Sequence, residues 1–370
     1  MRQYYLWLNA LREIGINKKM ELIRKFGDPQ QVYINLNKEM TRELVEEGFL
    51  KENAAKEIDA ARRDDWFKNY ENVLEAEEIK YITPLDEEYP ERLLMLYDAP
   101  LVLFYKGDIS LLKDAYTVGV IGSRRPTGYG RIIAKGLVGK MAERGITVIS
   151  GMAAGIDSVA HKATLDAAGR TIAVLGSGVN HCYPRENFPL YENIIECGLV
   201  ISEFGPEVPP LGINFPLRNR IISGLSEGVL VIEAALRSGT LITVDAALEQ
   251  GRLVYAVPGR VGDPLSEGTN NLIRNGAILV TKAEDIVEDL IGHTEESFVN
   301  QGNKNVNDTS DSMTDKEKKI YDCLSLMPVY IDDLIRKTGE TVTVVISTLY
   351  SMEKKGYITQ ETTGYYARKM

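Results

Sequence analysis

The feature that most constrains this chain is an alternation of short apolar runs with amphipathic helical stretches, from residue 116 to about residue 290. Each run is apolar at consecutive positions, which is typical of strands buried on both faces by crossover helices. The predicted strands are Thr117–Ile121, Thr147–Ser150, Thr171–Leu175, Leu199–Glu203, Val229–Glu233, Leu253–Val257 and Ala277–Val280. The alternation therefore predicts one α/β domain in residues 115–290, built on a doubly wound, mostly parallel sheet.

The segments on either side of this core have different patterns. Apolar residues at three- and four-residue spacing predict an N-terminal helical bundle in residues 1–75. The Ile14-Gly15-Ile16 turn gives this bundle a SAM- or helix-hairpin-helix-like character. A connector with one predicted strand, Leu101–Tyr105, occupies residues 76–114. The polar and acidic composition of residues 291–313 predicts a flexible linker.

The last segment, residues 314–370, is predicted to form a winged helix. Thr314 can cap its first helix, Ile331 begins a second, and residues 342–355 form a third. A two-stranded wing follows in residues 357–366. The third helix offers mainly Thr, Ser and Val, so a protein contact or a role as a lid is as reasonable here as DNA recognition.

The charge distribution leaves room for an anionic ligand. The whole chain has a net charge of −10, which by itself argues against a nucleic-acid binder. Residues 115–282, however, contain 16 basic and 14 acidic side chains, so the acidity lies in the flanking segments. Binding depends on the local field of a site rather than on total charge, and a polyanion is therefore not excluded.

Four glycine-rich loops follow predicted strands, at the edge where open α/β sheets bind ligands. They are residues 122–130, 150–157, 176–187 and 235–240. Glycines at such turns let a phosphate group approach the backbone amides at the start of a helix. The predicted contacts in the first and last loops are Gly122, Ser123, Ser238, Gly239 and Thr240.

Arginines accompany these loops and the helix start at residues 215–222. They are Arg124, Arg125, Arg185, Arg218, Arg220 and Arg237. Guanidinium groups bind phosphates bidentately and stack on bases, so a row of them with Tyr183 and Phe215 suits a single nucleic-acid strand. The alternative is that some of these arginines pair inside the protein with Glu186, Glu203 or Glu233.

Sequence motifs for other kinds of site are missing. There is no P-loop motif for nucleoside triphosphates and no Gly-x-Gly-x-x-Gly after the first core strand, so neither that ligand nor a dinucleotide cofactor is expected. The three histidines lack metal-ligand spacing, and the three cysteines form no close pair. We expect no metal and no catalytic residue, and we expect Asp157 to cap the helix that follows it.

No apolar run is long enough to span a membrane, and a cytoplasmic protein is expected.

At these loops the sequence resembles the DNA-processing protein A (DprA/Smf) family. The match is carried by Gly122–Arg124, the loop 150–157, Tyr183-Pro184, the segment 215–222 and Arg237–Thr243. Val257–Gly259 and residues 268–273 fit as well, so the resemblance covers residues 80–290 closely and the flanking domains in order and type.

The resemblance implies an extended Rossmann-like core that forms a homodimer and binds single-stranded DNA without catalytic turnover. It implies protection of incoming DNA and loading of the RecA recombinase during natural transformation. Family DNA contacts carry over to Ser123, Arg124 and the Phe215-Pro216-Leu217-Arg218-Asn219-Arg220 segment. The basic position after Tyr-Pro, often lysine in the family, is Arg185 here, which keeps the charge and changes its geometry.

Two other functions remain open. Related folds with a Gly-Thr loop resemble nucleotide phosphoribohydrolases, whose acidic residues follow that loop directly. Here the first acid after Gly239-Thr240 is Asp245, although general acid–base chemistry needs a carboxyl group within hydrogen-bond reach. The third possibility is an adaptor that binds only proteins, through its winged helix.

Overall fold

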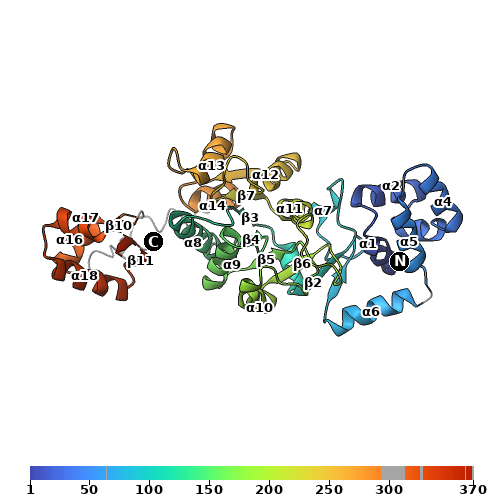
Figure 1. Cartoon of the computed structure of the whole chain (residues 1–370), viewed down its shortest axis with the longest axis horizontal. Helices are drawn as coiled ribbons and strands as arrows, with labels where there is room; N and C mark the ends of the chain where they lie inside the picture. The colour runs from blue at the N-terminus through green and yellow to red at the C-terminus, as the bar shows by residue number, and fades with distance from the viewer. Residues whose placement is uncertain (64, 293–312, 326–327, 363, 369–370) are drawn as a thin grey trace.

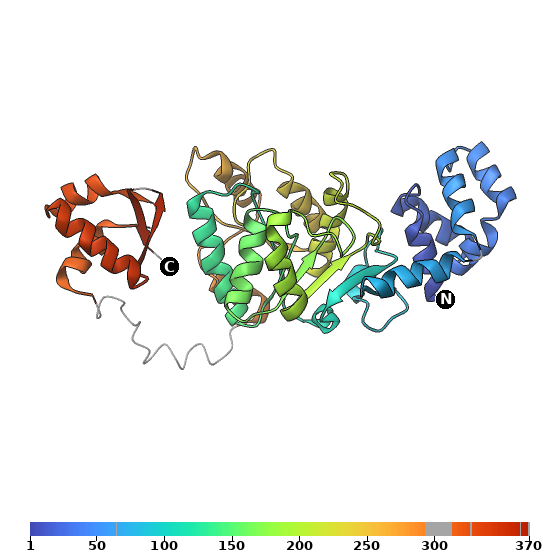
Figure 2. The same ribbon diagram turned by 60° about the horizontal axis from the view of Figure 1, so that its bottom comes forward.

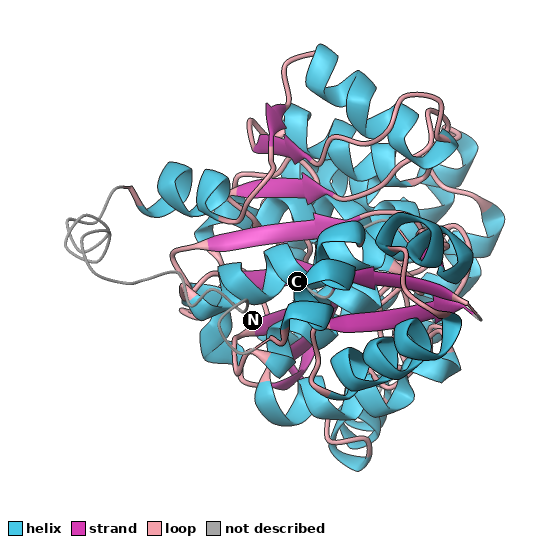
Figure 3. Ribbon diagram, turned by 90° about the vertical axis from the view of Figure 1, so that its left-hand side faces the viewer, coloured by secondary structure: helices cyan, strands magenta, loops and turns pink. Residues whose placement is uncertain are grey.

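Nine strands form one sheet that crosses the molecule with helices on both sides (Figure 3). Their order is β1-β2-β6-β5-β4-β3-β7-β8-β9. The seven parallel strands are β3 (Thr117–Ile121), β4 (Thr147–Ser150), β5 (Thr171–Val174), β6 (Leu199–Ser202), β7 (Gly228–Val231), β8 (Leu253–Ala256) and β9 (Ile278–Leu279). These strands confirm the predicted mostly parallel sheet. The computed structural model describes residues 1–63, 65–292, 313–325, 328–362 and 364–368, so nearly all of the predicted linker lies outside the described residues.

Two antiparallel strands extend one edge of the sheet. β2 (Leu103–Gly107) pairs antiparallel with β6, with Phe104 opposite Ser202. β1 (Lys80–Ile82) pairs with β2 in turn. The predicted strand in the connector is therefore present, beginning two residues later than expected. β1 was not predicted, because three residues are too few to show an alternating pattern.

Helices cover both faces of the parallel strands. One face is covered by α8 (Gly128–Glu143), α9 (Ile156–Asp166), α10 (Phe188–Cys197) and α14 (Glu284–Ile291). The other face is covered by α7 (Glu91–Leu94), α11 (Asn214–Leu225), α12 (Thr240–Glu249) and α13 (Pro264–Arg274). Figure 2 shows α8, α9 and α10 side by side on the first face. In β3, Val118 and Val120 pack with the first layer and Ile121 with the second, which explains the continuous apolar runs.

The N-terminal residues form a helical bundle at one end of the molecule (Figure 1). Its helices are α1 (Arg2–Ala10), α2 (Ile16–Phe26), α3 (Pro29–Asn35), α4 (Lys38–Glu46), α5 (Glu52–Ala61) and α6 (Trp66–Ala76). Asp28 and Asn37 cap α3 and α4 through their side-chain oxygens, which separates these short helices. One apolar cluster runs from Trp7 and Ile58 in the bundle to Phe104 and Val200 in the sheet. The bundle therefore shares a hydrophobic core with the edge of the sheet.

The C-terminal domain is a winged helix with a hydrophobic core of its own. Its helices are α16 (Asp315–Cys323), α17 (Ile331–Thr338) and α18 (Val342–Lys354), and its strands are β10 (Val329–Tyr330), β11 (Ile358–Thr362) and β12 (Tyr365–Arg368). Thr314 and Glu317 form a capping box at the start of α16, which confirms the predicted cap. No helix in the described part of the chain is long and apolar enough to cross a membrane.

Candidate nucleic-acid interface

A cleft opens at the point where the strand order reverses. From β3, the chain proceeds to β4, β5 and β6 on one side, and β7, β8 and β9 lie on the other. The loops after β3 and β7 therefore diverge and leave a space at the carboxyl ends of the strands, as expected of doubly wound sheets. The cleft has a volume of about 700 Å³.

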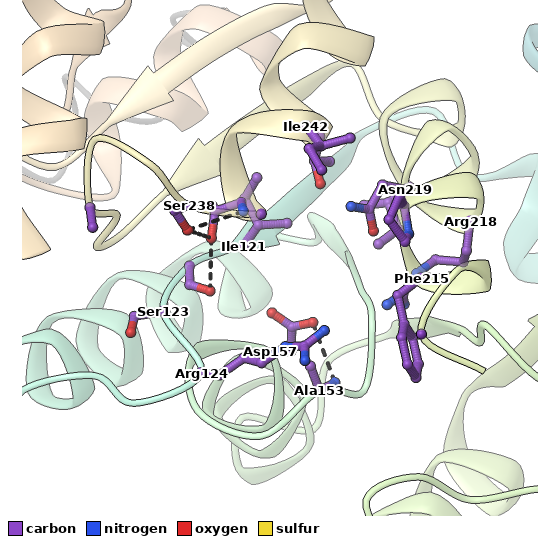
Figure 4. A pocket seen from close by; sticks show the side chains of 18 of the residues that line it. Ile121, Ser123, Arg124, Ala153, Asp157, Phe215, Arg218, Asn219, Ser238 and Ile242 are labelled. Atoms are coloured by element: carbon purple, nitrogen blue, oxygen red, sulfur yellow. Dashed lines mark hydrogen bonds between the residues drawn. The ribbon is translucent and has the colours of Figure 1, made fainter. Parts of the chain in front are cut away.

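Most of the predicted contacts line this cleft. Those that do are Gly122, Ser123, Arg124, Phe215, Arg218, Asn219, Arg237, Ser238, Gly239 and Thr240. Figure 4 shows Arg124 and Asp157 on one side of the cleft and Phe215, Arg218 and Asn219 of α11 on the other. Residues from four separate loops and helices thus come together, as expected of loops that share one edge of a sheet.

Hydroxyl groups tie the two diverging loops to each other. The Thr240 hydroxyl accepts a hydrogen bond from the Ser238 hydroxyl at 3.0 Å and donates one to the Gly122 carbonyl at 3.2 Å (Figure 4). The backbone N–H of Thr240 also donates to the Ser238 hydroxyl. The start of α12 is therefore held against the first glycine loop.

Arg218 is a buried cation without an anionic partner. Its residue is 3% exposed, and one guanidinium nitrogen donates to the carbonyl oxygen of Val174. Its Nε has no hydrogen-bond partner, and no carboxylate lies within ion-pair distance among the described residues. Burial lowers the pKa of Arg218 to about 10, so it remains charged at neutral pH. The Asp157 carboxylate opposes this shift without forming an ion pair, so Arg218 could still pair with an anionic ligand in the cleft.

Two glycines let the loop after β4 approach its neighbours closely, Gly151 toward Arg218 and Gly155 toward the first glycine loop. A Cβ at Gly151 would lie 2.2 Å from a guanidinium nitrogen of Arg218, so only glycine fits there. Gly155 has a φ of +88°, and a Cβ would lie 2.3 Å from the Ser123 carbonyl oxygen. The next residue, Ile156, donates its N–H to that same oxygen at 3.1 Å. The loop after β4 therefore holds both Arg218 and the first glycine loop in place.

An aromatic pair borders the cleft beside the exposed Arg124. The rings of Tyr183 and Phe215 stack with centroids 5.6 Å apart and an interplanar angle of 29°. The Arg124 guanidinium lies over the Phe215 ring, 5.4 Å from its centroid. Such a combination of a cation and flat rings can contact both the phosphate and the base of a nucleotide.

Asp157 has a different role from the predicted one. It is the second residue of α9, where Gly155 is the N-cap, and its carboxylate accepts hydrogen bonds from the N–H groups of Gly151 and Ala153. The prediction that Asp157 caps α9 is therefore wrong, because the carboxylate closes the preceding loop instead. Burial raises its pKa from 3.8 to about 6, although the nearby Arg218 opposes that shift.

The sequence did not indicate that Asp157 lines the cleft. Its position directly after a glycine loop of an α/β sheet was the only available signal, and such a position also suits an ordinary helix cap.

Arg220 does not lie in the cleft. Its guanidinium forms an ion pair with Glu203 and a second with Asp98, at 3.0 Å, and the residue is 8% exposed. Our prediction of Arg220 as a DNA contact is therefore wrong, and the alternative of an internal pair holds for this residue. Helical geometry explains this, because residues two positions apart on a helix point to nearly opposite sides.

Arg125 and Arg185 are exposed but do not line the cleft. Both lie on loops whose neighbouring residues, Arg124 and Tyr183, do line it. They could contact a ligand that extends beyond the cleft, but not one confined within it.

The cleft contains little that resembles a catalytic group. Asp157 is the only carboxylate among the described residues that line it. His161 is buried with its Nδ1 2.7 Å from the Thr171 hydroxyl, and burial lowers its pKa to about 3. In the described part of the chain, no cluster of three or more potential metal ligands occurs.

Comparisons with known proteins agree with the resemblance found in the sequence. A family model for the DNA recombination-mediator protein A matches residues 80–291, and a model for the DprA winged helix domain matches residues 307–362. Protein Smf of Escherichia coli is 50% identical over 212 residues, which are 57% of this chain and 56% of that protein. The DNA processing protein DprA of Bacillus subtilis is 46% identical over 204 residues, 55% of this chain and 69% of that protein. The match therefore spans little more than half of the E. coli protein.

Two solved structures are similar to this one. DNA processing protein A from Streptococcus pneumoniae has a TM-score of 0.57 and 36% identity, covering 75% of this chain and 99% of that one. The Helicobacter pylori protein, described for its single-stranded DNA binding mode, has a TM-score of 0.53 and 29% identity, covering 58% of this chain and 97% of that one. The family model covers more than half of the chain and agrees with both the fold and the motifs in the glycine loops. The chain belongs to the DNA recombination-mediator protein A family.

Proposed function

We propose that this protein binds single-stranded DNA in the cleft between the β3 and β7 loops and does not cut it. The observation that carries the proposal is Arg218, a buried guanidinium with no carboxylate partner among the described residues. A phosphate group supplies the missing charge, and the stacked pair of Tyr183 and Phe215 supplies a platform for a base. Because stacking and phosphate contacts do not read base edges, the cleft contacts are largely independent of sequence.

The first test is the salt dependence of binding. An oligo-dT of about 20 nucleotides releases counterions when cationic side chains neutralise its phosphates, so its affinity falls steeply with rising salt. Fluorescence anisotropy between about 50 mM and about 200 mM salt measures this slope. A flat response would rule out phosphate contacts as the source of affinity.

The second test removes the cleft arginines one at a time. Arg124→Ala and Arg218→Ala should each weaken oligo-dT binding about tenfold or more, because hydrogen bonds to charged groups are among the stronger ones. The thermal unfolding temperature should stay unchanged in Arg124→Ala, because that side chain is exposed and forms no ion pair among the described residues, whereas Arg218→Ala should lower it, because it removes a buried side chain that is bonded to the Val174 carbonyl.

Arg144→Ala is the matched control. It makes the same charge change at the C-terminal end of α8, on an exposed residue. That end lies at the opposite edge of the sheet, because α8 runs antiparallel to the strand that precedes it. Equal losses of affinity in all three variants would indicate a nonspecific charge effect and contradict the proposed site.

The wider role follows from the family. We infer that the protein protects incoming single-stranded DNA, passes it to the RecA recombinase during natural transformation, and acts in the cytoplasm as a homodimer formed through the core. Nuclease resistance of the bound oligonucleotide tests protection. RecA-dependent strand exchange on DNA precoated with single-strand binding protein tests loading, and sedimentation tests the dimer. We expect Arg218→Ala protein neither to protect the oligonucleotide from nuclease nor to support RecA-dependent strand exchange.

A nucleotide hydrolase remains the second candidate, favoured by one observation. Asp157 lines the cleft with a raised pKa of about 6, a value suited to a general acid. Against this, Asp157 is bonded to two backbone N–H groups, and Asp245 does not line the cleft. Chromatographic detection of free base from nucleoside monophosphates, lost in Asp157→Asn, would establish this activity.

A further inference from the structure

The loop after β4 contains a residue in a left-handed backbone conformation. Met152 has a φ of +57° and is completely buried, although residues other than glycine rarely adopt this conformation. It lies between Gly151, which packs against Arg218, and Ala153, which lines the cleft. Such a conformation costs free energy, so it persists only where the surrounding contacts hold it. The contacts that hold Met152 therefore also determine the shape of the cleft at this point.

The peptide group between Met152 and Ala153 is held at both ends. Its carbonyl oxygen accepts a hydrogen bond from the side-chain Nδ2 of Asn187 at 2.9 Å. Its N–H donates to the Asp157 carboxylate at 3.4 Å (Figure 4). The same Asn187 nitrogen lies 3.5 Å from the Ala153 carbonyl oxygen, and two acceptors on this side require the amino group of the amide. One half-buried side chain therefore bridges the loops after β4 and β5.

Asn187 also belongs to the loop that carries the aromatic platform, the stacked rings of Tyr183 and Phe215. It ends the short 3₁₀ helix η2 (Arg185–Asn187), and its backbone N–H donates to the Pro184 carbonyl at 3.1 Å. Tyr183 directly precedes this turn and lines the cleft. Asn187 is the N-cap of α10, yet its side chain makes no capping hydrogen bond there. Helix capping therefore does not explain the direction of this side chain, which bonds to the loop after β4 instead.

The two sides of this bridge are anchored differently. In the loop after β4, the Asp157 carboxylate also accepts from the Gly151 N–H at 3.2 Å, and a backbone hydrogen bond joins the start of α9 to the first glycine loop. In the loop after β5, the pairing of His181 Nε2 with a backbone carbonyl oxygen at 2.9 Å comes before Tyr183 in the chain, and the Asn187 bond comes after it. Loss of the Asn187 bond therefore loosens the aromatic platform more than the floor of the cleft.

We propose that Asn187 is a positioning residue for the bound strand, an inference that rests on the proposed function. It fixes the aromatic platform relative to Arg124 and Arg218, so that a base can stack while the adjoining phosphate meets a guanidinium group. Asn187 does not line the cleft, so it acts through Tyr183 rather than by touching DNA. Without its hydrogen bond, the phosphate contacts remain and the contribution of base stacking falls.

The experiment compares two strands on the full chain, an oligo-dT of about 20 nucleotides and a fully abasic strand of the same length. Asn187→Ala should weaken oligo-dT binding roughly tenfold, the size of one lost base stack. The affinity for the abasic strand should change by less than about twofold, because that strand offers only sugars and phosphates. Asn187→Leu keeps the approximate size and the charge of the side chain but removes the donor, and it should show the same selective loss.

A double-mutant cycle asks whether Asn187 acts through Tyr183. In Tyr183→Ala protein, Asn187→Ala should cost little further oligo-dT affinity, because the ring that it positions is already gone. A residue that only supports the fold would weaken binding by the same factor with or without the ring. Asn193→Ala makes the same change on an exposed residue of α10 and should leave both affinities unchanged. Thermal unfolding shows that each variant is folded, and Asn187→Leu replaces Asn187→Ala in the cycle if the latter is not.

The outcomes separate this inference from the proposed function. If oligo-dT fails to bind the unmodified protein, the proposed function fails and the positioning role fails with it. If oligo-dT binds but the Asn187 variants weaken both strands equally, or weaken neither, the positioning role is overturned and the cleft stands. Additive losses in the double variant overturn it as well. A loss confined to oligo-dT that disappears in the Tyr183→Ala background is the result expected of a positioning residue.

Discussion

Burial shifts the pKa values of two charged residues in the cleft, Arg218 and Asp157. Arg218 and Asp157 are both buried at its floor, with opposite charges and no ion pair between them. Burial lowers the pKa of Arg218 and raises that of Asp157, so each charged form is less stable than in water. A phosphate bound there would be attracted by the arginine and repelled by the carboxylate. Under the proposed function, Asp157 would therefore limit the affinity of the cleft, while its hydrogen bonds to Gly151 and Ala153 shape the loop.

Asp157→Asn should strengthen oligo-dT binding by on the order of 1 kcal/mol, because it removes a negative charge near the phosphate and keeps an acceptor for the loop. The affinity of the unmodified protein should rise as the pH falls from about 7.5 to about 5.5, since Asp157 becomes protonated near its pKa of about 6. The variant should lack that part of the pH response. Anisotropy titrations of both proteins across this range give the measurement.

Folding stability should follow the same titration. The raised pKa of Asp157 contributes stability that is fully present below its ordinary value of 3.8 and lost as the pH rises through about 6. Asp157→Asn should therefore unfold at a higher temperature than the unmodified protein at neutral pH. Weaker DNA binding together with lower stability would instead show that the loop needs the charged carboxylate, whose Oδ2 accepts both hydrogen bonds.

At the scale of elements, α11 places its two arginines in different surroundings. Arg218 lines the cleft, and Arg220 forms internal ion pairs with Glu203 and Asp98. The loop after β4 packs against the first of these through Gly151, where a Cβ would displace the guanidinium. Packing between a helix and a loop, rather than the arginines alone, therefore decides which cation faces the cleft.

Gly151→Ala should abolish most oligo-dT binding, because its Cβ would lie 2.2 Å from the Arg218 guanidinium and displace it. The control is Gly139→Ala within α8, where the nearest atom to a Cβ is 4.0 Å away. That substitution should leave binding unchanged and stabilise the protein by about 0.5–1 kcal/mol, the helix-propensity difference. Intact binding in Gly151→Ala would show that Arg218 can reach the ligand from another conformation.

At the scale of the whole molecule, the N-terminal bundle, the core and the winged helix differ in how well they suit contact with an anionic ligand. The bundle shares its core with the sheet, whereas the winged helix has a separate one. The third helix of the winged helix exposes Val342, Ile346 and Tyr350, and Lys355 behind it is held by Glu317. Such a surface suits a protein contact better than the phosphates of DNA.

Removing the winged helix should therefore leave DNA affinity unchanged. A chain ending at residue 292 keeps the bundle, the sheet and the cleft, and its oligo-dT titration should overlay that of the full protein. An unfolding measurement on the shortened chain checks that its core is intact. Much weaker binding by a folded, shortened protein would assign the winged helix a direct part in holding DNA.

Sequence alone determined the parts of this protein that depend on local pattern. Residue order alone predicts the seven buried strands, the cap at Thr314 and the glycine loops at one sheet edge. Burial on both faces and helix capping each require particular residue types at neighbouring positions, so both can be recognised in the sequence. Tertiary structure decided which side chains meet. Only packing could separate Arg218 from Arg220, direct the carboxylate of Asp157 to the preceding loop, and bring Asn9 of the bundle against the Glu203 carbonyl, 194 residues away in the chain. Such contacts depend on the three-dimensional path of the backbone, which adjacent residues do not encode.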